Sequence, residues 1–351
     1  MDLMSNTAEQ SSFTLKAVPF YPDAIPIVFA SDNNYVPYMS ATIQSIIENS
    51  NQSRKYIFFI LHRTISNESA SLLNKQVSPH QQFSIEFIDV TEYVSKYDLF
   101  VSRHITVEAY YRFLIPEIFY KYEKAIYLDC DMIVLADISE LFDIDLGNHI
   151  LASTRDITVL NWHYASKVSK KVAGTRNSLP IMKDTSNYFC DGLCFFNIPL
   201  FRNTVSQTEL FDLAMANEWD SHDQDVLNIL CEGKVLFLPF HWGFYKSNDF
   251  EYFPENYKNE YIDAMKHPKI IHFTSKPWKS YYGYRFESFW KYATRSPFIN
   301  NIINNMRSNN MLEQPIKKMV LGFIKKRRFG LKFILFDCVR AWIFRGKIKK
   351  K

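Results

Sequence analysis

Two acidic residues, Asp129 and Asp131, stand directly after the apolar segment 125–128. That segment predicts a buried strand, so both carboxylates would leave the sheet at one strand end, where they can turn toward the same cation. Oxygen ligands of this kind suit Mn²⁺ or Mg²⁺, which usually also takes oxygens from a substrate diphosphate. The spacing alone is weak evidence because it recurs at 143–145 and 223–225, but the position after a strand favours the first pair.

A second group of residues that could do chemistry lies further along the chain. His272 ends the strand-like segment 269–271, and Lys276 follows four positions later. Beside a metal site, the ammonium of Lys276 could hold a phosphate as a point charge. A structural histidine and a surface lysine are the alternative interpretations of these two residues.

The elements that must position these residues alternate between strands and helices. Hydrophobic patterning predicts strands at 25–30, 56–61, 83–90, 125–128, 150–153 and 193–196, and helices at 39–49, 66–77 and 108–119, the last kinked or ended by Pro116. This alternation predicts an α/β fold with a mainly parallel sheet flanked by helices on both faces. Ligands of such sheets bind beyond the carboxyl ends of the strands, where the acidic pair and the polar cluster 31–34 both stand.

The composition is that of an ordinary globular protein. The chain has 351 residues, enough for one or two domains, of which 47% are hydrophobic and 22% charged. Its five cysteines form no Cys-x-x-Cys pair, which argues against a disulfide framework and against a zinc cluster. The sequence shows neither a signal-peptide pattern nor an apolar run of about 20 residues. We therefore expect a cytoplasmic protein.

The C-terminal segment 317–351 differs from the rest of the chain. It is rich in lysine and arginine, contains one acidic residue, Asp337, and interleaves its charges with aromatic and aliphatic residues. Because charges interrupt every apolar run, we expect a small basic helical tail that lies on the anionic inner face of the cytoplasmic membrane without crossing it. A tail that binds nucleic acid nonspecifically is the alternative, and no specific nucleic-acid partner is expected. The expected division is a polar leader at 1–24, a main domain at 25–300 and a membrane-associating tail at 301–351.

Five short segments, in this order along the chain, resemble glycosyltransferase family 8. They are Phe-Ala-Ser-Asp-Asn-Asn-Tyr at 29–35, Tyr-Tyr-Arg-Phe at 110–113, Tyr-Leu-Asp-Cys-Asp at 127–131, Asp-Gln-Asp at 223–225, and His272 with Lys-Pro-Trp at 276–278. The nearest likeness is to bacterial lipopolysaccharide galactosyl- and glucosyltransferases, and it makes 25–300 the catalytic domain. The resemblance implies a GT-A type, Rossmann-like fold and a retaining enzyme. Such an enzyme moves galactose or glucose from a UDP-sugar to a saccharide or lipid-linked saccharide acceptor, in lipopolysaccharide or other surface-glycan synthesis.

The resemblance also implies a role for each matching residue on the nucleotide side. The uridine would be held by residues of the first motif, with Asp32 accepting from the base and Tyr35 stacking on it; the full set is Ala30, Asp32, Asn34 and Tyr35. Arg112 would contact the diphosphate or the donor sugar. Asp129, Asp131 and His272 would bind Mn²⁺, with Mg²⁺ as the alternative ion, and Lys276 would neutralise the departing diphosphate.

On the sugar side, the resemblance implies that Asp156 and Asp223 face the donor sugar and that Gln224 lies near the anomeric carbon. No carboxylate nucleophile is evident from the motifs, so front-face attack assisted by Gln224 and the donor phosphate is the preferred hypothesis. A covalent sugar on Asp156, Asp191 or Asp223 is the alternative. The metal and the lysine would stabilise the leaving group in either case.

The chain departs from the family pattern at Cys190 and Asp191. Relatives usually have Phe-Asn-(Ala/Ser)-Gly where this sequence has Phe-Cys-Asp-Gly at 189–192. Either the donor sugar differs, or Asp191 takes over the contact of the missing amide. Two other functions stay open: a nucleotide-sugar-binding protein with a decayed catalytic site, and a phosphohydrolase in which Asp129 is the nucleophile and Asp131 the acid/base.

Overall fold

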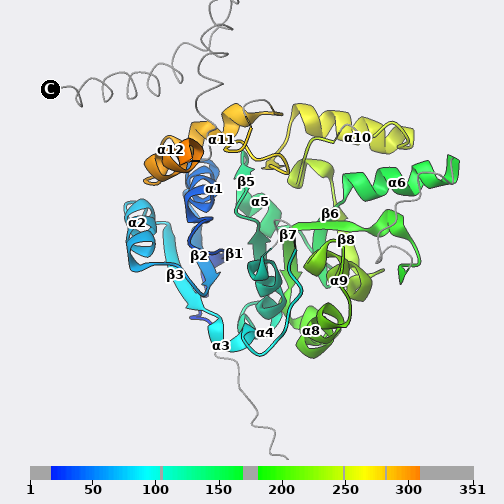
Figure 1. Ribbon diagram of the computed structural model, residues 1–351, viewed down its shortest axis with the longest axis horizontal. Helices are drawn as coiled ribbons and strands as arrows, with labels where there is room; N and C mark the ends of the chain where they lie inside the picture. The colour runs from blue at the N-terminus through cyan, green and yellow to red at the C-terminus, as the bar shows by residue number, and fades with distance from the viewer. Residues whose placement is uncertain (1–16, 103–105, 169–180, 248–249, 281–282, 309–351) are drawn as a thin grey trace, which may run out of the picture.

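The computed structural model describes residues 17–102, 106–168, 181–247, 250–280 and 283–308 (Figure 1). The basic tail predicted at 317–351 lies outside these residues, as does most of the predicted leader at 1–24. Within the described ranges, no helix combines the length and the apolar surface that a bilayer span requires.

A seven-stranded sheet forms the centre of the molecule, in the order β3-β2-β1-β4-β7-β6-β8 (Figure 1). The strands are β1 (Ala24–Ala30), β2 (Lys55–His62), β3 (Phe83–Asp89), β4 (Lys124–Leu128), β6 (Leu151–Arg155), β7 (Phe189–Asn197) and β8 (Val235–Leu238). Neighbouring strands are parallel except at β7, which runs antiparallel to both β4 and β6. The predicted mainly parallel sheet is therefore confirmed, and six of its seven strands lie at or near predicted segments.

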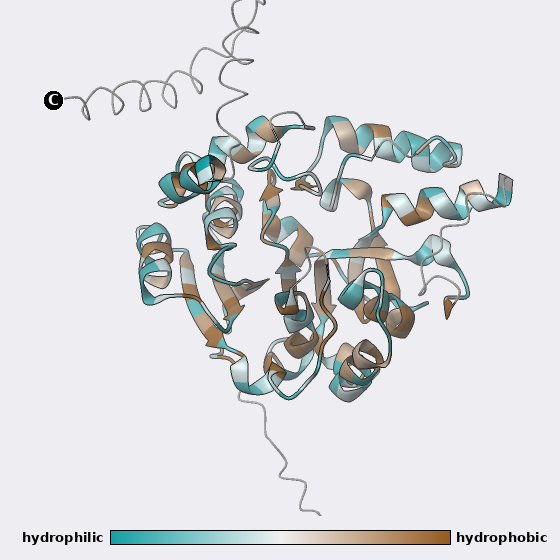
Figure 2. Ribbon diagram, in the orientation of Figure 1, coloured by the Kyte–Doolittle hydropathy of each residue, from teal (hydrophilic) through white to brown (hydrophobic). Residues whose placement is uncertain are grey.

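Helices cover both faces of this sheet because its strands are apolar on both sides. Along β2, every second side chain from Tyr56 to Ile60 points to the same face of the sheet. These side chains join a cluster with α1 (Val36–Asn49) and α2 (Asn67–Val77). The intervening side chains, such as Ile57, join a cluster with α8 (Gln207–Ala216) and α9 (His222–Cys231). Figure 2 shows the strands as mainly hydrophobic and the helices as mixtures of hydrophobic and hydrophilic residues.

The segment predicted as one helix at 108–119 is helical, but it forms two consecutive helices of different kinds. Residues Val107–Leu114 form a 3-10 helix, η1, and the α-helix α4 covers only Ile115–Ile118. Pro116 lies in the first turn of α4, where its missing N–H is not needed, so the proline marks a new start and not a kink within one helix.

A second, two-stranded sheet was not predicted as such. It pairs β5 (Met132–Val134) with β9 (Ile270–His272) in antiparallel register, with Met132 opposite His272. Aromatic residues of α11 (Phe286–Ala293) and buried residues of α12 (Ile299–Ser308) pack against this small sheet and α1. Helix α12 crosses the predicted domain boundary at residue 300. The remaining elements are α3 (Thr91–Val94), α5 (Ile138–Phe142), α6 (Ile157–Val168), η4 (Thr185–Asn187), α7 (Ile198–Arg202), η5 (Phe240–Trp242) and α10 (Glu255–Lys266).

Candidate active site

The carboxyl ends of β1, β4 and β6 meet at one edge of the main sheet and carry three of the predicted polar segments. The segment 31–34 follows β1, Asp129 follows β4, and Asp156 follows β6. Strands β1 and β4 are adjacent and parallel, with Ile27 opposite Ile126, so the first two segments emerge side by side. The sheet topology thus brings the predicted residues to the edge where ligands of α/β sheets bind.

The acidic pair and His272 form a compact group of potential metal ligands. One ligand atom from each of Asp129, Asp131 and His272 lies within 4.8 Å of the others. The Nε2 atom of His272 is 3.2 Å from Asp131 Oδ1 and 3.7 Å from Asp129 Oδ2. Pairing of β5 with β9 produces this contact, because it places the end of β9 opposite Met132, directly after the acidic pair.

The residues of this group fit a divalent cation. Two carboxylates and one imidazole nitrogen suit an ion such as Mn²⁺, and waters and phosphate oxygens can complete its coordination. The Oδ1 atom of Asp131 is buried, yet no donor among the described residues makes a well-aligned hydrogen bond to it. A buried carboxylate oxygen of this kind, 3.2 Å from an imidazole nitrogen, is an arrangement that a shared cation would satisfy.

Strand β7 holds the imidazole ring of His272 from behind. A Cβ atom at Gly192 would lie 2.6 Å from His272 Cε1, so only glycine leaves room for the ring. The Sγ atom of Cys190 lies 3.7 Å from His272 Nδ1, on the side of the ring away from the carboxylates. The Gly192 carbonyl also accepts a 2.8 Å hydrogen bond from the Asp129 N–H, which fixes the start of the acidic loop.

Charges in the ligand group are strongly coupled. Burial alone would raise the pKa of Asp131, but the positive charges of Lys276 and His272 outweigh it and hold that pKa well below its ordinary value. Burial likewise opposes the charged form of His272, but the attraction of Asp131 raises the pKa of the imidazole well above its usual range. Lys276 Nζ contacts Asp131 Oδ2 directly. The site is therefore built to hold positive charge against Asp131.

Arg112 is the hub of a second, buried cluster. Its guanidinium lies 3.0 Å from Asp129 Oδ1, 2.9 Å from Asp191 Oδ2 and 2.8 Å from Asp223 Oδ2. It also lies over the ring of Tyr127, 4.4 Å from the ring centroid. Arg112 is only 4% exposed. Its guanidinium therefore pairs with three carboxylates inside the protein, and one of them, Asp129, belongs to the metal-ligand group.

Asp191, the departure from the family pattern, belongs to this cluster. Burial raises the pKa of Asp191, the charge of Arg112 opposes that rise, and the nearby carboxylate of Asp223 adds to it, so the pKa lies well above its ordinary value. The additional acid is thus held against the guanidinium of Arg112, and its raised pKa follows from burial and from the neighbouring Asp223.

The residues predicted to hold uridine lie next to the acidic pair. Asp32 accepts hydrogen bonds from the Tyr35 N–H at 2.8 Å and from Asn34 Nδ2 at 3.0 Å, which shapes the loop after β1. The Ala30 carbonyl accepts from the Cys130 thiol at 3.2 Å and so ties this loop to the acidic one. Tyr35 packs edge-on against Trp278, whose indole stacks on Tyr38 at 3.9 Å.

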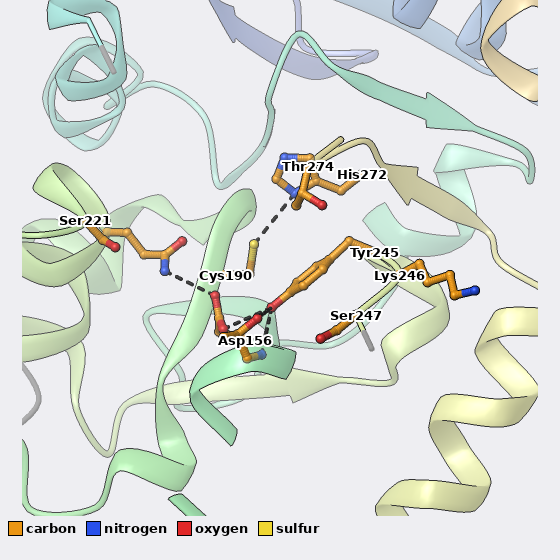
Figure 3. A pocket seen from close by; sticks show the side chains of 10 residues that line it. Asp156, Cys190, Ser221, Tyr245, Lys246, Ser247, His272 and Thr274 are labelled. Atoms are coloured by element: carbon orange, nitrogen blue, oxygen red, sulfur yellow. Dashed lines mark hydrogen bonds between the residues drawn. The ribbon is translucent and has the colours of Figure 1, made fainter. Parts of the chain in front are cut away.

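A polar cavity of about 370 Å³ adjoins the metal-ligand group (Figure 3). Its lining residues are Asp156, Thr158, Cys190, Ser221, Gln224, Tyr245, Lys246, Ser247, His272 and Thr274. Within it, Gln224 Nε2 donates to Asp156 Oδ2 at 3.3 Å. Of the four residues predicted as catalytic, Asp156 and Gln224 line the cavity, whereas the carboxylates of Asp191 and Asp223 point to Arg112.

Sequence reasoning missed the cavity wall that follows η5. Tyr245, Lys246 and Ser247 stand in a segment without a recognisable motif, and no periodicity distinguishes it. Asp225, the other acid of the 223–225 triplet, is buried and bonded to the Tyr188 hydroxyl and the Ser221 N–H. The triplet 223–225 therefore combines Asp223, an acid of the Arg112 cluster, with Asp225, a structural acid.

A mainly parallel α/β sheet with a group of potential metal ligands and a cavity at its carboxyl edge has the architecture of a glycosyltransferase of the GT-A type. The sequence model of "Glycosyl transferase family 8" matches residues 26–281, and the chain belongs to that family.

Individual relatives agree with this assignment. Glycosyltransferase GlyB of Streptococcus pneumoniae is 27% identical over 270 residues, which is 75% of this chain and 60% of GlyB. Lipopolysaccharide 1,2-glucosyltransferase of Escherichia coli K12 is 23% identical over 49% of this chain and 48% of that enzyme. The apo structure of the bifunctional glycosyltransferase WbbM superposes with a TM-score of 0.72 at 26% identity, covering 83% of this chain and 53% of WbbM. The chain thus spans less than two thirds of each of these proteins.

Proposed function

We propose that this protein is a retaining hexosyltransferase that moves galactose or glucose from a UDP-sugar to a saccharide acceptor, with Mn²⁺ assisting the departure of UDP. The observation that carries the proposal is the contact between the group Asp129, Asp131 and His272 and a polar cavity lined by Asp156 and Gln224. A diphosphate at the former would place its attached sugar toward the latter, since His272 belongs to both.

The chemistry requires such an arrangement. Breaking the bond between the anomeric carbon and the phosphate oxygen leaves negative charge on the nucleotide diphosphate and positive charge on the sugar ring. A divalent ion held by Asp129, Asp131 and His272 would supply Lewis-acid stabilisation of the diphosphate. Lys276 adds a second positive charge at the same place, and Arg112 holds the carboxylate of Asp129 in its orientation.

Retention is proposed to follow from front-face attack. Asp191 and Asp223 are engaged by Arg112, so neither carboxylate is presented to the cavity as a nucleophile. Asp156 lines the cavity, but it accepts hydrogen bonds from the Val159 N–H, the Tyr245 hydroxyl and Gln224. These donors reduce its nucleophilicity and favour its use as a fixed negative charge facing the developing cation.

We further propose a lipid-linked saccharide of lipopolysaccharide or another surface glycan as the acceptor, handled at the inner face of the cytoplasmic membrane. The name of the Escherichia coli relative supports the acceptor class. The basic, aromatic-rich composition of 317–351 supports the location, because such a segment binds anionic lipid surfaces.

The test is release of UDP from a panel of UDP-sugars, with and without Mn²⁺ and an acceptor saccharide. We expect metal-dependent release from UDP-galactose or UDP-glucose, and transfer with retained anomeric configuration. Tight UDP binding without release from any donor would show a nucleotide-sugar-binding protein with a decayed site. Phosphate release from simple aryl phosphates would instead support the phosphohydrolase, which the family assignment does not favour.

A further inference from the structure

The chain immediately after η5 connects two parts of the candidate site. Its Phe244 N–H donates to the Ile270 carbonyl at 3.0 Å, and the His272 N–H donates to the Phe244 carbonyl at 2.8 Å. On its other side it approaches β6, where a Cβ atom at Gly243 would lie 2.7 Å from Thr154 Oγ1. Only glycine allows this approach. The segment therefore pairs with the strand that carries His272 and touches the strand that leads to Asp156.

Tyr245 uses this position to reach the sugar-facing carboxylate. Its buried hydroxyl donates to Asp156 Oδ1 at 3.0 Å and accepts from the Thr158 N–H at 3.0 Å (Figure 3). The same Oδ1 atom accepts from the Val159 N–H at 2.8 Å. The Oδ1 atom of Asp156 therefore accepts hydrogen bonds from the Val159 N–H in α6 and from the Tyr245 hydroxyl on the opposite wall of the cavity.

The hydrogen bonds continue from Asp156 across the cavity. Asp156 Oδ2 accepts from Gln224 Nε2 at 3.3 Å, and Gln224 Oε1 accepts from the Asp191 N–H at 3.3 Å. Both ends of the Gln224 amide therefore have a partner, and one of these partners is the carboxylate that Tyr245 holds. Tyr245 and Gln224 thus bond to different oxygens of the same carboxylate.

We propose that Tyr245 is a positioning residue for sugar transfer: its hydroxyl fixes the Asp156 carboxylate and, through it, the amide of Gln224. This inference rests on the proposed transferase function. Without the hydroxyl, Asp156 Oδ1 would keep only the Val159 N–H, and the carboxylate could rotate about its bond to Cβ. Gln224 would then lose the fixed partner that directs its amide across the cavity.

The first test is Tyr245→Phe, which removes the hydroxyl and keeps the ring. We expect kcat for UDP release to fall at least about tenfold, because misplacing groups at the reacting centre costs rate more than binding. The KM for the donor and the Kd for UDP with Mn²⁺ should change by less than about twofold. Tyr122→Phe is the matched control, because Tyr122 is also buried and lies far from the cavity. Its hydroxyl accepts a hydrogen bond from the Tyr21 N–H and donates one to the Pro19 carbonyl. Tyr122→Phe should leave kcat unchanged.

The second test asks whether Tyr245 acts through Asp156. In a double-mutant cycle, Tyr245→Phe combined with Asp156→Asn should lose no more activity than Asp156→Asn alone. Losses that multiply, or a kcat for Tyr245→Phe equal to that of the wild type, would overturn the inference. A purely structural role would lower the melting temperature without this non-additivity.

Failure of the proposed function has a separate signature, because the wild type itself would then release no UDP from any UDP-sugar. The positioning role can be tested in that case too, by crystal structures of the wild type and of Tyr245→Phe. We expect the Asp156 carboxylate and the Gln224 amide to change orientation in the variant. Unmoved side chains would overturn the inference without any assay of activity.

Discussion

At the scale of single residues, the site depends on side chains whose partners come from distant parts of the sequence. Asp129 touches Arg112 on one side and His272 on the other, and Asp131 touches His272 and Lys276. Each carboxylate is thus held by at least one positive group before any substrate arrives. In the proposed reaction, such preorganised charge would stabilise the leaving diphosphate without the cost of reorganising the site.

Replacing either acid of the metal-ligand group should remove turnover while leaving the fold intact. We expect Asp129→Ala and Asp131→Ala each to lower metal-dependent UDP release by more than about a hundredfold. Removing a residue that only hydrogen-bonds to a metal ligand costs up to about a hundredfold, and loss of a ligand itself should cost more. The control is Asp145→Ala, from the exposed triplet 143–145, which has the same spacing. Asp145→Ala should keep metal-dependent UDP release close to that of the wild type. Activity within a few-fold of wild type in both site variants would defeat the assignment.

Gly192 should be needed for the metal site and not for stability alone. Alanine there would place Cβ 2.6 Å from the His272 ring, so the ring must shift. We expect the Kd for Mn²⁺, measured by electron paramagnetic resonance, to rise about 10- to 100-fold. Gly147→Ala is the opposite control, because Gly147 has a positive φ but no neighbour within 4 Å. Gly147→Ala should lower the stability of the fold and leave the Mn²⁺ affinity unchanged. If both variants bound Mn²⁺ with the same affinity, the proposed packing of Gly192 against His272 would be contradicted.

At the scale of elements, the sequence predicted most strands and the edge at which the site lies. Apolar runs identified β1 to β4, β6 and the second half of β7, because a strand covered on both faces must be largely apolar. Strand direction and pairing were not predictable in this way. Hydrophobic periodicity is the same for parallel and antiparallel neighbours, so neither the reversed β7 nor the β5–β9 pair could be read from it.

The candidate site was predicted to a similar extent. The motifs that resemble family 8 named Asp129, Asp131 and His272, and the structure brings these together. They did not indicate that Arg112 would be occupied by three carboxylates, because the extra acid Asp191 has no counterpart in the family pattern. Tyr245 escaped notice because its role depends on a loop conformation that only the packing of Gly243 reveals.

Asp137 is the residue that caps α5 and ties it to its surroundings. Its carboxylate accepts from the Ser139 N–H and hydroxyl and from the Asn51 N–H. Burial alone would raise the pKa of Asp137, but these hydrogen bonds outweigh it and lower the pKa below its ordinary value. A group with a lowered folded-state pKa stabilises the fold above its unfolded pKa, and this contribution is lost as the pH falls through the folded value.

We therefore expect Asp137→Ala to lower the free energy of unfolding at pH 7 by about 0.5–2 kcal/mol, the usual range for losing an N-cap. The difference from wild type should shrink as the pH falls below about 4, where the aspartate is protonated in the unfolded chain. Urea denaturation of both proteins at pH 7 and at a pH below about 4 measures the difference in the free energy of unfolding. A difference that is constant with pH would show that the carboxylate charge is not involved.

At the scale of the whole molecule, the chain separates a mildly acidic body from a strongly basic C-terminal segment. Deleting 317–351 should release the protein from vesicles that contain anionic lipid while preserving UDP release from the donor. Vesicles of zwitterionic lipid serve as the control, because the electrostatic part of the binding requires anionic headgroups. Sedimentation of both forms with both vesicle types measures the effect. Retention of the truncated chain on anionic vesicles would refute the proposed anchoring role.

The most direct test of the account is a crystal structure of the protein soaked with Mn²⁺ and a non-hydrolysable UDP-sugar. We expect anomalous density for one ion bound by Asp129, Asp131 and His272 and by both phosphates of the donor, with the sugar in the cavity beside Asp156. An ion bound elsewhere, or a donor bound with no ion between these three side chains, would contradict the central claim.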